Sequence, residues 1–162
     1  MSKMFSRLFS LYLLVFYTAT VVCAQDSFRS IVPFVTTRVE VEKKIGKPNE
    51  YGRYELDEGR VYILYRETEC ETLDNSCFCL VPIGTVLQVE VQPYFDVSIE
   101  DLKLDPKLWE RVDVTGGHIP GEVYTNHKTG VTYEVMNGRI AEIIYRVSKD
   151  TCKMLSERRS PH

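Results

Sequence analysis

The sequence has no excess of positive charge and no cluster of basic side chains. Lysine and arginine together number 20, and aspartate and glutamate 23, which gives a formal net charge of −3. Proteins that bind nucleic acids use basic clusters to neutralise the phosphate groups. We therefore exclude a nucleic-acid-binding function.

The motifs of common enzyme classes are missing as well. The sequence has no Gly-x-Ser-x-Gly elbow, no His-Glu-x-x-His pair and no phosphate-binding loop. His118 and His127 could act as a general base or a metal ligand. Both stand among Gly, Pro, Asn and Lys residues in predicted loops, where a solvated histidine is the usual case. The sequence thus predicts a protein that is not an enzyme and that holds no metal or other cofactor.

The apolar stretch near the N-terminus, Leu8–Val22, is shorter than the roughly 20 residues that a membrane-spanning helix needs. It follows a basic start and leads to Ala24, a small residue that suits cleavage. These features predict a signal peptide over residues 1–24 and an exported protein, periplasmic or extracellular. In an alternative interpretation Cys23 carries a lipid, which would bring the protein to a membrane.

Cleavage after Ala24 would leave 138 residues, enough for one domain with a sizeable core. Lys3 and Arg7 would leave with the signal peptide. The exported chain would then carry 18 basic against 23 acidic side chains, and it would stay mildly acidic.

Four of the five cysteines belong to the exported part: Cys70, Cys77, Cys79 and Cys152. In an oxidising compartment this even number predicts disulfides. We favour a Cys70–Cys152 bond, which leaves Cys77 to pair with Cys79, and pairing of Cys70 with Cys77 or Cys79 stays open. An alternative function makes Cys77-Phe78-Cys79 a thiol-based metal or redox site. Its spacing differs from the Cys-x-x-Cys of zinc ribbons and thioredoxin-like sites.

A short helix is predicted over Arg38–Ile45. Thr37 and Glu40 form a capping box that satisfies two backbone N–H groups of the first turn. Gly46 offers the C-cap, and Pro48 cannot continue a helix. The valines of this segment alternate with polar residues, which also fits a strand, but the two caps favour the helix.

Alternation of apolar and polar residues between turn signals predicts six strands. They are expected at residues 51–56, 60–67, 85–92, 122–126, 131–136 and 139–147. Asn137-Gly138, between the last two, is the strongest hairpin signal in the chain. Ser98 and Asp105-Pro106 are predicted to start a second helical segment. The apolar side of this segment is expected to consist of Leu102, Leu104, Leu108, Trp109 and Val112.

A helix followed by strands is thus predicted twice. The runs Tyr54–Arg66 and Tyr133–Arg146 share the order Tyr-Glu-apolar, Gly-Arg turn and apolar strand ending in Tyr-Arg. We predict an α+β fold in which residues 25–152 form a single small domain of two related helix-plus-antiparallel-strand halves, about 29–96 and 97–152. Residues 153–162 are expected to form a flexible tail.

Tyrosine is abundant, with ten residues. Most are expected to cover the core, and some could line a sheet face that grips a protein or peptide, since tyrosine suits interfaces. The candidates for this surface are Tyr54, Tyr62, Tyr65, Tyr133 and Tyr145. The predicted function is a non-enzymatic binding or envelope-interaction module, stabilised by disulfides, with an unidentified protein or peptide partner.

Three segments resemble a set of uncharacterised exported bacterial proteins. Residues 36–48 follow their pattern T-T-R-x-x-V-E-x-x-x-G-x-P, Asp101–Asp105 reads D-L-K-L-D, and Tyr124–Val135 matches a later part. The chain departs from the pattern at Val39, usually polar, and in the added Cys77-Phe78-Cys79. More distantly, the helix, Gly-x-Pro and strands are similar to the α+β fold of the outer-membrane assembly component BamE (SmpA/OmlA) and of β-lactamase-inhibitor-like proteins. This resemblance implies a binding module, and the bacterial set implies export without assigning an activity.

Overall fold

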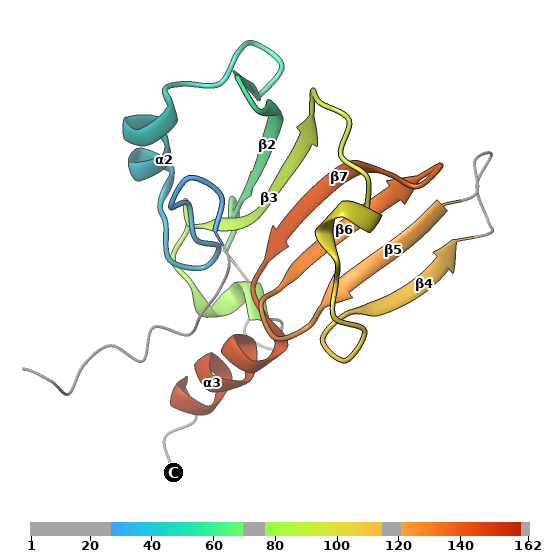
Figure 1. Ribbon diagram of the computed structural model, residues 1–162. Coiled ribbons are helices and arrows are strands. Elements are labelled where there is room, and N and C mark those ends of the chain that lie inside the picture. Colours follow the sequence, from blue (N-terminus) through green and yellow to red (C-terminus); the bar gives the residue numbers. More distant parts are fainter. Residues whose placement is uncertain (1–26, 70–76, 115–120, 160–162) are drawn as a thin grey trace, which may run out of the picture.

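Seven antiparallel strands share one sheet in the order β1-β2-β3-β7-β6-β5-β4 (Figure 1). The structure is a computed structural model that describes residues 27–69, 77–114 and 121–159. The predicted signal peptide, Cys23, Cys70 and His118 lie outside these ranges. The elements are α2 (Arg38–Ile45), β1 (Arg53–Leu56), β2 (Gly59–Tyr65), η1 (Cys77–Leu80), β3 (Val86–Pro93), η2 (Glu100–Leu102), β4 (Glu110–Val114), β5 (Gly121–Asn126), β6 (Val131–Met136), β7 (Arg139–Arg146) and α3 (Lys149–Arg159).

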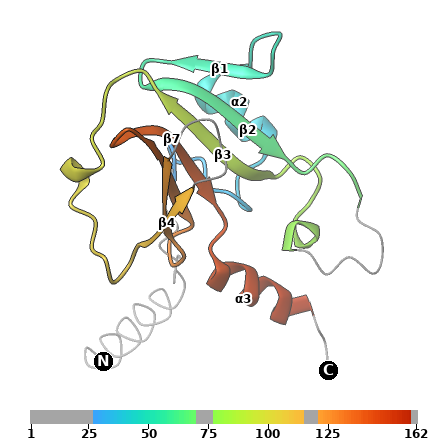
Figure 2. The ribbon, with the colours of Figure 1, turned by 90° about the vertical axis from the view of Figure 1, so that its right-hand side faces the viewer.

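Helix α2 has the predicted bounds and the predicted caps. The backbone N–H of Thr37 donates to Glu40 Oε2 (2.8 Å), and that of Glu40 to Thr37 Oγ1 (3.4 Å). Gly46 ends the helix with a φ of 85°, a value that glycine adopts readily. Val41 is fully buried. Figure 2 shows α2 against one face of β1, β2 and β3.

The six predicted strands are also confirmed, with ends that shift by one or two residues. At the predicted hairpin, Asn137 and Gly138 have φ values of 53° and 75°, the pair of positive angles that a type I′ turn requires. Val135 opposes Ile140 across this hairpin. Both side chains point to the face of the sheet that also carries α2, so the two clusters of the core lie on the same face.

The core on this face consists of two clusters. The larger one lies under α2 and contains eight buried residues: Ile31, Val41, Tyr54, Val61, Tyr65, Val86, Val89 and Val91. The smaller one has three, Ile99 from the irregular segment 97–104 and Val135 and Ile140 from the sheet beneath it. Backbone hydrogen bonds from Ile99 N to Gly138 O (3.1 Å) and from Ile140 N to Val97 O (2.9 Å) fasten this segment to the sheet.

The α+β class is confirmed, but the prediction of two related halves is wrong. Where the second helix was expected, the chain forms only the three-residue 3₁₀ turn η2 and then the strand β4. Asp105 Oδ1 accepts a hydrogen bond from Lys107 N (2.9 Å), which closes a local turn instead of capping a helix. Val112, expected on a helix face, pairs with Val123 of β5. Strand pairing has overridden the local helix signals.

The two runs with the same residue order also take different places in the sheet. The first run forms β1 and β2, and β1 is an edge strand. The second forms β6 and β7, which are each paired on both sides. The shared order therefore reflects similar strand chemistry and not an equivalent position.

The segment from residue 153, predicted as a flexible tail, continues helix α3 to Arg159. Ser148 starts this helix, because its Oγ accepts a hydrogen bond from Thr151 N (3.1 Å), as an N-cap does. Sequence reasoning missed this cap. Across the described residues, no helix combines the length and the apolar character needed to cross a membrane.

Candidate functional site

A pocket of about 440 Å³ lies where β2, β3 and β7 meet the segments before α2 and around η1. We call it the apolar pocket, after its predominantly apolar wall. It is lined by Phe34, Leu64, Phe78, Leu87, Gln88, Arg146 and Val147. Its volume lies in the range of small-molecule and anchor-residue sites, roughly 300–1,000 Å³.

Two irregularities of the backbone shape this pocket. Leu64 pairs with Gln88 and Tyr65 with Val86, so Leu87 is an extra residue that bulges from β3. Bulges redirect side chains, and this one brings Leu87 to the pocket wall. Phe34 has a φ of 65°, unfavourable for a residue with a Cβ, and its N–H donates to Val86 O (2.7 Å). The fold thus tolerates a strained residue at the pocket.

The wall that carries Phe78 is held by covalent and polar links. Cys77 forms a disulfide with Cys152, so η1 is joined to helix α3. Arg66, at the end of β2, donates through its guanidinium to the backbone oxygens of Val81 and Cys79. These links fix the position of a wall that has little regular secondary structure.

The disulfide corrects the favoured pairing of the cysteines. Cys77 bonds to Cys152 with a Cα–Cα distance of 5.6 Å, not to Cys79. The favoured Cys70–Cys152 bond is therefore wrong too, because Cys152 is already bonded to Cys77. Cys79 is buried and is a disulfide cysteine as well, and Cys70 itself lies outside the described residues. Metal binding and redox attack both need a thiolate, so no observation favours a thiol site at Cys77 and Cys79.

Beside the apolar wall runs a line of polar groups. Arg146 donates through Nε to Gln88 Oε1, and Gln88 donates in turn to Glu90. Farther along this face, Gln92 Nε2 donates to Glu142 Oε1 (3.4 Å). Partial burial and the Glu90 carboxylate raise the pKa of Glu142. Polar groups thus continue from the pocket to the middle of the sheet.

Of the five tyrosines predicted as an interaction surface, Tyr54 and Tyr65 belong to the larger core cluster. They are 3% and 9% exposed, and their hydroxyl oxygens lie 3.1 Å apart. Burial, followed by this hydrogen bond, raises the pKa of Tyr65. The Arg38 guanidinium covers the Tyr65 ring at 4.4 Å from its centroid. These two rings therefore connect β1, β2 and the start of α2 within the core, and they are not available as an interaction surface.

The other three tyrosines are partly buried. Tyr133 stacks on Trp109 with ring centroids 5.0 Å apart, and Tyr145 packs near Phe28 at 6.2 Å. Tyr62 points to the opposite face of the sheet, where Arg53 lies 5.2 Å from its ring centroid. The five rings therefore do not form one continuous surface.

His127 lies in the turn between β5 and β6, where its Nε2 is 2.5 Å from Glu110 Oε2. This contact lowers the pKa of Glu110. Both side chains are exposed. Within residues 27–69, 77–114 and 121–159, no group of three or more His, Cys, Asp or Glu side chains could hold a metal ion.

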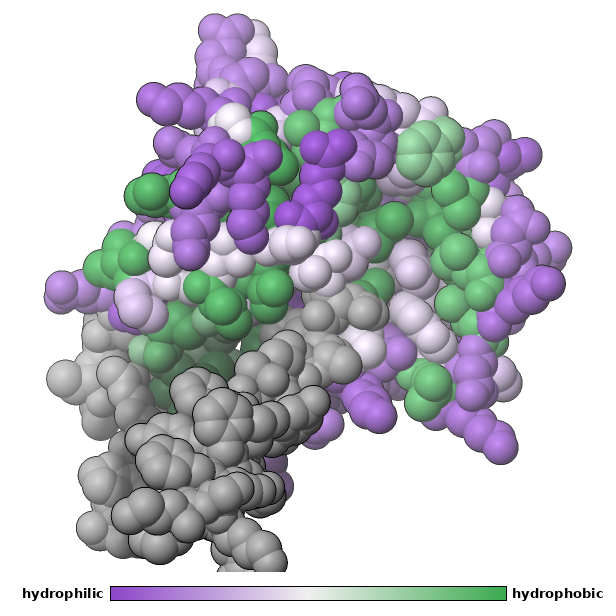
Figure 3. All heavy atoms as spheres, turned by 60° about the vertical axis from the view of Figure 1, so that its left-hand side comes forward, coloured by the Kyte–Doolittle hydropathy of each residue, from purple (hydrophilic) through white to green (hydrophobic). Residues whose placement is uncertain are grey.

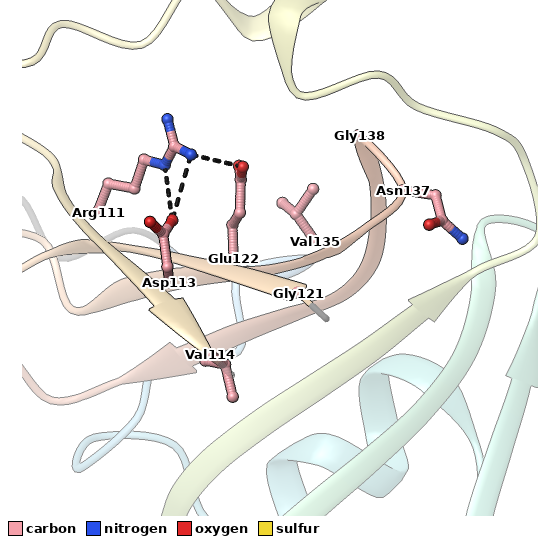
Figure 4. Close-up of a pocket in the computed structure, with 8 residues that line it drawn as sticks. All are labelled: Arg111, Asp113, Val114, Gly121, Glu122, Val135, Asn137 and Gly138. Carbon is pink, nitrogen blue, oxygen red and sulfur yellow. Dashed lines mark hydrogen bonds and ion pairs between the residues drawn. The ribbon is translucent and has the colours of Figure 1, made fainter. Parts of the chain in front are cut away.

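A second pocket, of about 360 Å³, lies beside β4 at the far end of the sheet and is called the charged pocket here. Its lining consists of Arg111, Asp113, Val114, Gly121, Glu122, Val135, Asn137 and Gly138. Figure 4 shows Arg111 directed at both carboxylates, Glu122 and Asp113. The N–O distances are 2.7 Å to Glu122 and 3.2 Å to Asp113. The Glu122 carboxylate raises the pKa of Arg111.

Exposed apolar side chains also occur away from both pockets. On the side of the molecule that carries α2, they form separate groups between hydrophilic side chains (Figure 3). Val35 and Val39, for example, are 69% and 77% exposed. Such scattered side chains are normal on protein surfaces. Exposed apolar side chains that border a pocket are stronger evidence for a binding site.

Comparisons with protein-family models, curated proteins and solved structures find no match to this chain. The apolar pocket is therefore the strongest functional indication. Sequence reasoning did not find it, because its residues come from five separate segments. The one local signal was Phe78, an aromatic residue between two cysteines.

Proposed function

We propose that this protein is an exported, non-enzymatic binding module that holds an apolar side chain of a protein or peptide partner in the apolar pocket. The observation that carries the proposal is the combination of this pocket with two large apolar side chains at its border. Leu64 is 55% exposed and Phe78 54% exposed. Apolar pockets that accept an anchor residue dominate the binding energy of many protein interfaces.

The polar part of the wall indicates the chemistry beside the anchor. Arg146 brings a permanent positive charge to an otherwise uncharged lining. A carboxylate of the partner would interact favourably with this charge. We therefore expect an acidic residue close to the apolar anchor. Neither Arg146 nor Gln88 is a general base at neutral pH, which supports binding without catalysis.

The disulfide supports export, since such bonds persist in oxidising compartments. Action in the cell envelope rests on the predicted signal peptide and on the resemblance to exported bacterial proteins and to BamE. We include the periplasm or the extracellular space in the proposal on these grounds. A lipid on Cys23 would place the same pocket at a membrane surface.

The test is selection of peptides from a random library on the disulfide-bonded protein, followed by affinity measurements with single variants. We expect the selected peptides to combine a large apolar residue with a nearby Asp or Glu. Leu64→Glu and Phe78→Glu should weaken their binding by about tenfold or more, because each adds a charge at the pocket. Arg146→Gln should reduce the preference for acidic peptides.

The chain offers closely matched controls. Leu108 and Phe95 are exposed to 52% and 55%, and neither lines the apolar pocket. Leu108→Glu and Phe95→Glu should therefore leave binding unchanged. A selection that yields no binder, or binding that Leu64→Glu leaves intact, would refute the proposal. A small amphiphile that copurifies with the wild type and is lost from Leu64→Glu would instead assign the pocket to a small ligand.

A further inference from the structure

Strand β4 is an edge of the sheet that is open to solvent. Among the described residues it pairs only with β5, and all five of its residues are exposed. The outer side of an edge strand presents backbone N–H and C=O groups to whatever strand comes next. Val112 and Val114 remain 51% and 42% exposed there.

The register with β5 assigns the side chains of β4 to two faces. Arg111 opposes Tyr124, and Asp113 opposes Glu122, so both lie on the face of the charged pocket. Figure 4 shows these charged side chains on the same side of the sheet. Glu110, Val112 and Val114 alternate with them and lie on the other face. One face of the edge thus has opposite charges two residues apart, and the other has two exposed valines.

We propose that β4 binds the β4 strand of a second copy of this chain, antiparallel and centred on Val112. A two-fold axis perpendicular to a continuous sheet leaves the two faces of the sheet unchanged, so each side chain and its symmetry mate lie on the same face. Residues that oppose one another must therefore lie on the same face, and the axis must pass at a residue and not between two residues. The residues in the interior of β4 allow three such registers.

Charge selects one of the three. Centred on Val112, the pairing sets Arg111 opposite Asp113 of the second copy, twice by symmetry, and sets the two Val112 side chains against each other. Centred on Arg111, it opposes two arginines. Centred on Asp113, it opposes two aspartates. Opposite charges across an antiparallel pair stabilise and like charges destabilise, so only the first register pairs opposite charges and opposes no like ones.

The same register extends the apolar contact. On the valine face, each Val114 lies opposite Glu110 of the second copy and diagonal to its Val112. The surface that five residues bury is modest, so we expect a weak and concentration-dependent dimer. This inference concerns a different surface from the apolar pocket and does not depend on the proposed function.

The test uses sedimentation velocity on the disulfide-bonded protein over a concentration series. Arg111→Asp leaves two acidic residues on the charged face of the edge, and Asp113→Arg leaves two basic ones. Each variant should dimerise about tenfold more weakly than the wild type, or worse, because two favourable pairs become repulsive. An equimolar mixture of the two variants should associate again, since each acidic residue then opposes a basic one.

Arg139→Asp is the matched control. Arg139 forms an exposed ion pair with Asp96 and does not lie on β4, so its reversal should leave association unchanged. Circular dichroism should show that every variant keeps its strand content. A wild-type chain that stays monomeric up to about 1 mM would overturn the proposal and leave this edge to a strand of another protein. A dimer that ignores both reversals, or a mixture that fails to associate, would overturn it as well.

Discussion

The two ends of the sheet are built from similar antiparallel strands, but they are covered in different ways. Helix α2 lies over β1, β2 and β3 and closes a core of eight buried residues. The irregular segment 97–104 lies over the other end and closes a core of three. That end finishes in β4, which is exposed throughout. The covering element, more than the strands, determines how much of each end is buried.

This difference suggests a division of roles. The end with α2 supplies most of the buried apolar surface and therefore most of the hydrophobic stabilisation. The thinly covered end leaves a strand edge and a charged pocket accessible. The apolar pocket lies at the ends of β2, β3 and β7, where the two parts meet. Four predictions test this comparison.

The largest effect is expected from the link between the two parts. The Cys77–Cys152 disulfide joins η1, which follows β2, to α3, which follows β7, across 75 residues of sequence. Replacing both cysteines by serine should lower the free energy of unfolding by about 4 kcal/mol, through the loop that the bond closes in the unfolded chain. Urea unfolding monitored by circular dichroism measures this loss. Met154→Ser, an exposed change in α3, should cost less than about 0.5 kcal/mol.

The two cores can be compared directly with one substitution. Ile31 in the larger cluster is 0% exposed, and Ile140 in the smaller cluster is 6% exposed. We expect Ile31→Ala to cost about 3 kcal/mol and Ile140→Ala about 2 kcal/mol, because a cavity in the thinner core can collapse more completely. Equilibrium unfolding in urea gives both values. Equal losses would show that the smaller cluster is packed as tightly as the larger one.

The covering elements differ in their caps. Thr37 and Glu40 cap α2 with two reciprocal hydrogen bonds, whereas Ser98 Oγ accepts a single bond from Glu100 N at the three-residue turn η2. Thr37→Ala should therefore cost about 1 kcal/mol, and Ser98→Ala only a few tenths of that amount. Thermal unfolding of the two variants under one set of conditions compares them. A larger effect for Ser98→Ala would contradict our account of how the two ends are covered.

The smallest effect is expected on the polar face between the two ends. Glu142 opposes Glu134 across β6 and β7, and burial and Glu90 raise its pKa above the ordinary 4.5. The folded protein therefore binds the proton of this carboxyl more tightly than the unfolded chain does. As the pH rises above 4.5, the carboxyl loses this proton and the folded state becomes less stable. Glu142→Gln should be more stable than the wild type at pH 7 by a few tenths of a kcal/mol.

The pH dependence of that difference is the sharper test. At pH 3, well below the ordinary pKa of 4.5, the Glu142 carboxyl is protonated in both states, so the advantage of Glu142→Gln should vanish as the pH falls toward that value. Urea unfolding at several pH values between 3 and 8 measures this change. An advantage that grows as the pH falls would contradict the assigned direction of the pKa shift.

Local signals in the sequence were sufficient for α2 and for the hairpin at Asn137-Gly138. In both cases the deciding interactions are local: Thr37 and Glu40 bond to backbone N–H groups of the first helical turn, and Asn137 and Gly138 adopt the backbone angles of the turn. No distant contact is needed. Strand β4 was missed because Leu108 and Trp109 continue an apolar spacing that also fits a helix. Only the pairing with β5, which joins residues up to 15 positions apart along the chain, selects the strand.

The candidate site was less predictable than the fold. The cysteine pairing depends on where α3 lies relative to η1, and four cysteines alone allow three pairings. The apolar pocket depends on the bulge at Leu87 and on the positive φ of Phe34, neither of which has a distinctive residue at its position. A glycine or an asparagine at position 34 would have indicated the positive φ. Such features follow from tertiary packing and leave no pattern in the sequence.

The Cys77–Cys152 bond also determines how the protein would respond to a pulling force. A force applied at the two ends of the chain would pass directly from Cys77 to Cys152 through the disulfide. Strands β3 to β7 lie inside this closed loop, and they would not be stretched. The chain from Cys77 to Cys152, a separation of 75 residues, would span about 250 Å if fully extended, at roughly 3.3 Å per residue. The disulfide prevents this part of the extension. Among the described residues, only those outside the loop would lengthen under load, namely residues 27–69 with α2, β1 and β2, and the end of α3. Most of the sheet and its open edge would therefore stay folded under a tension that unfolds the other segments.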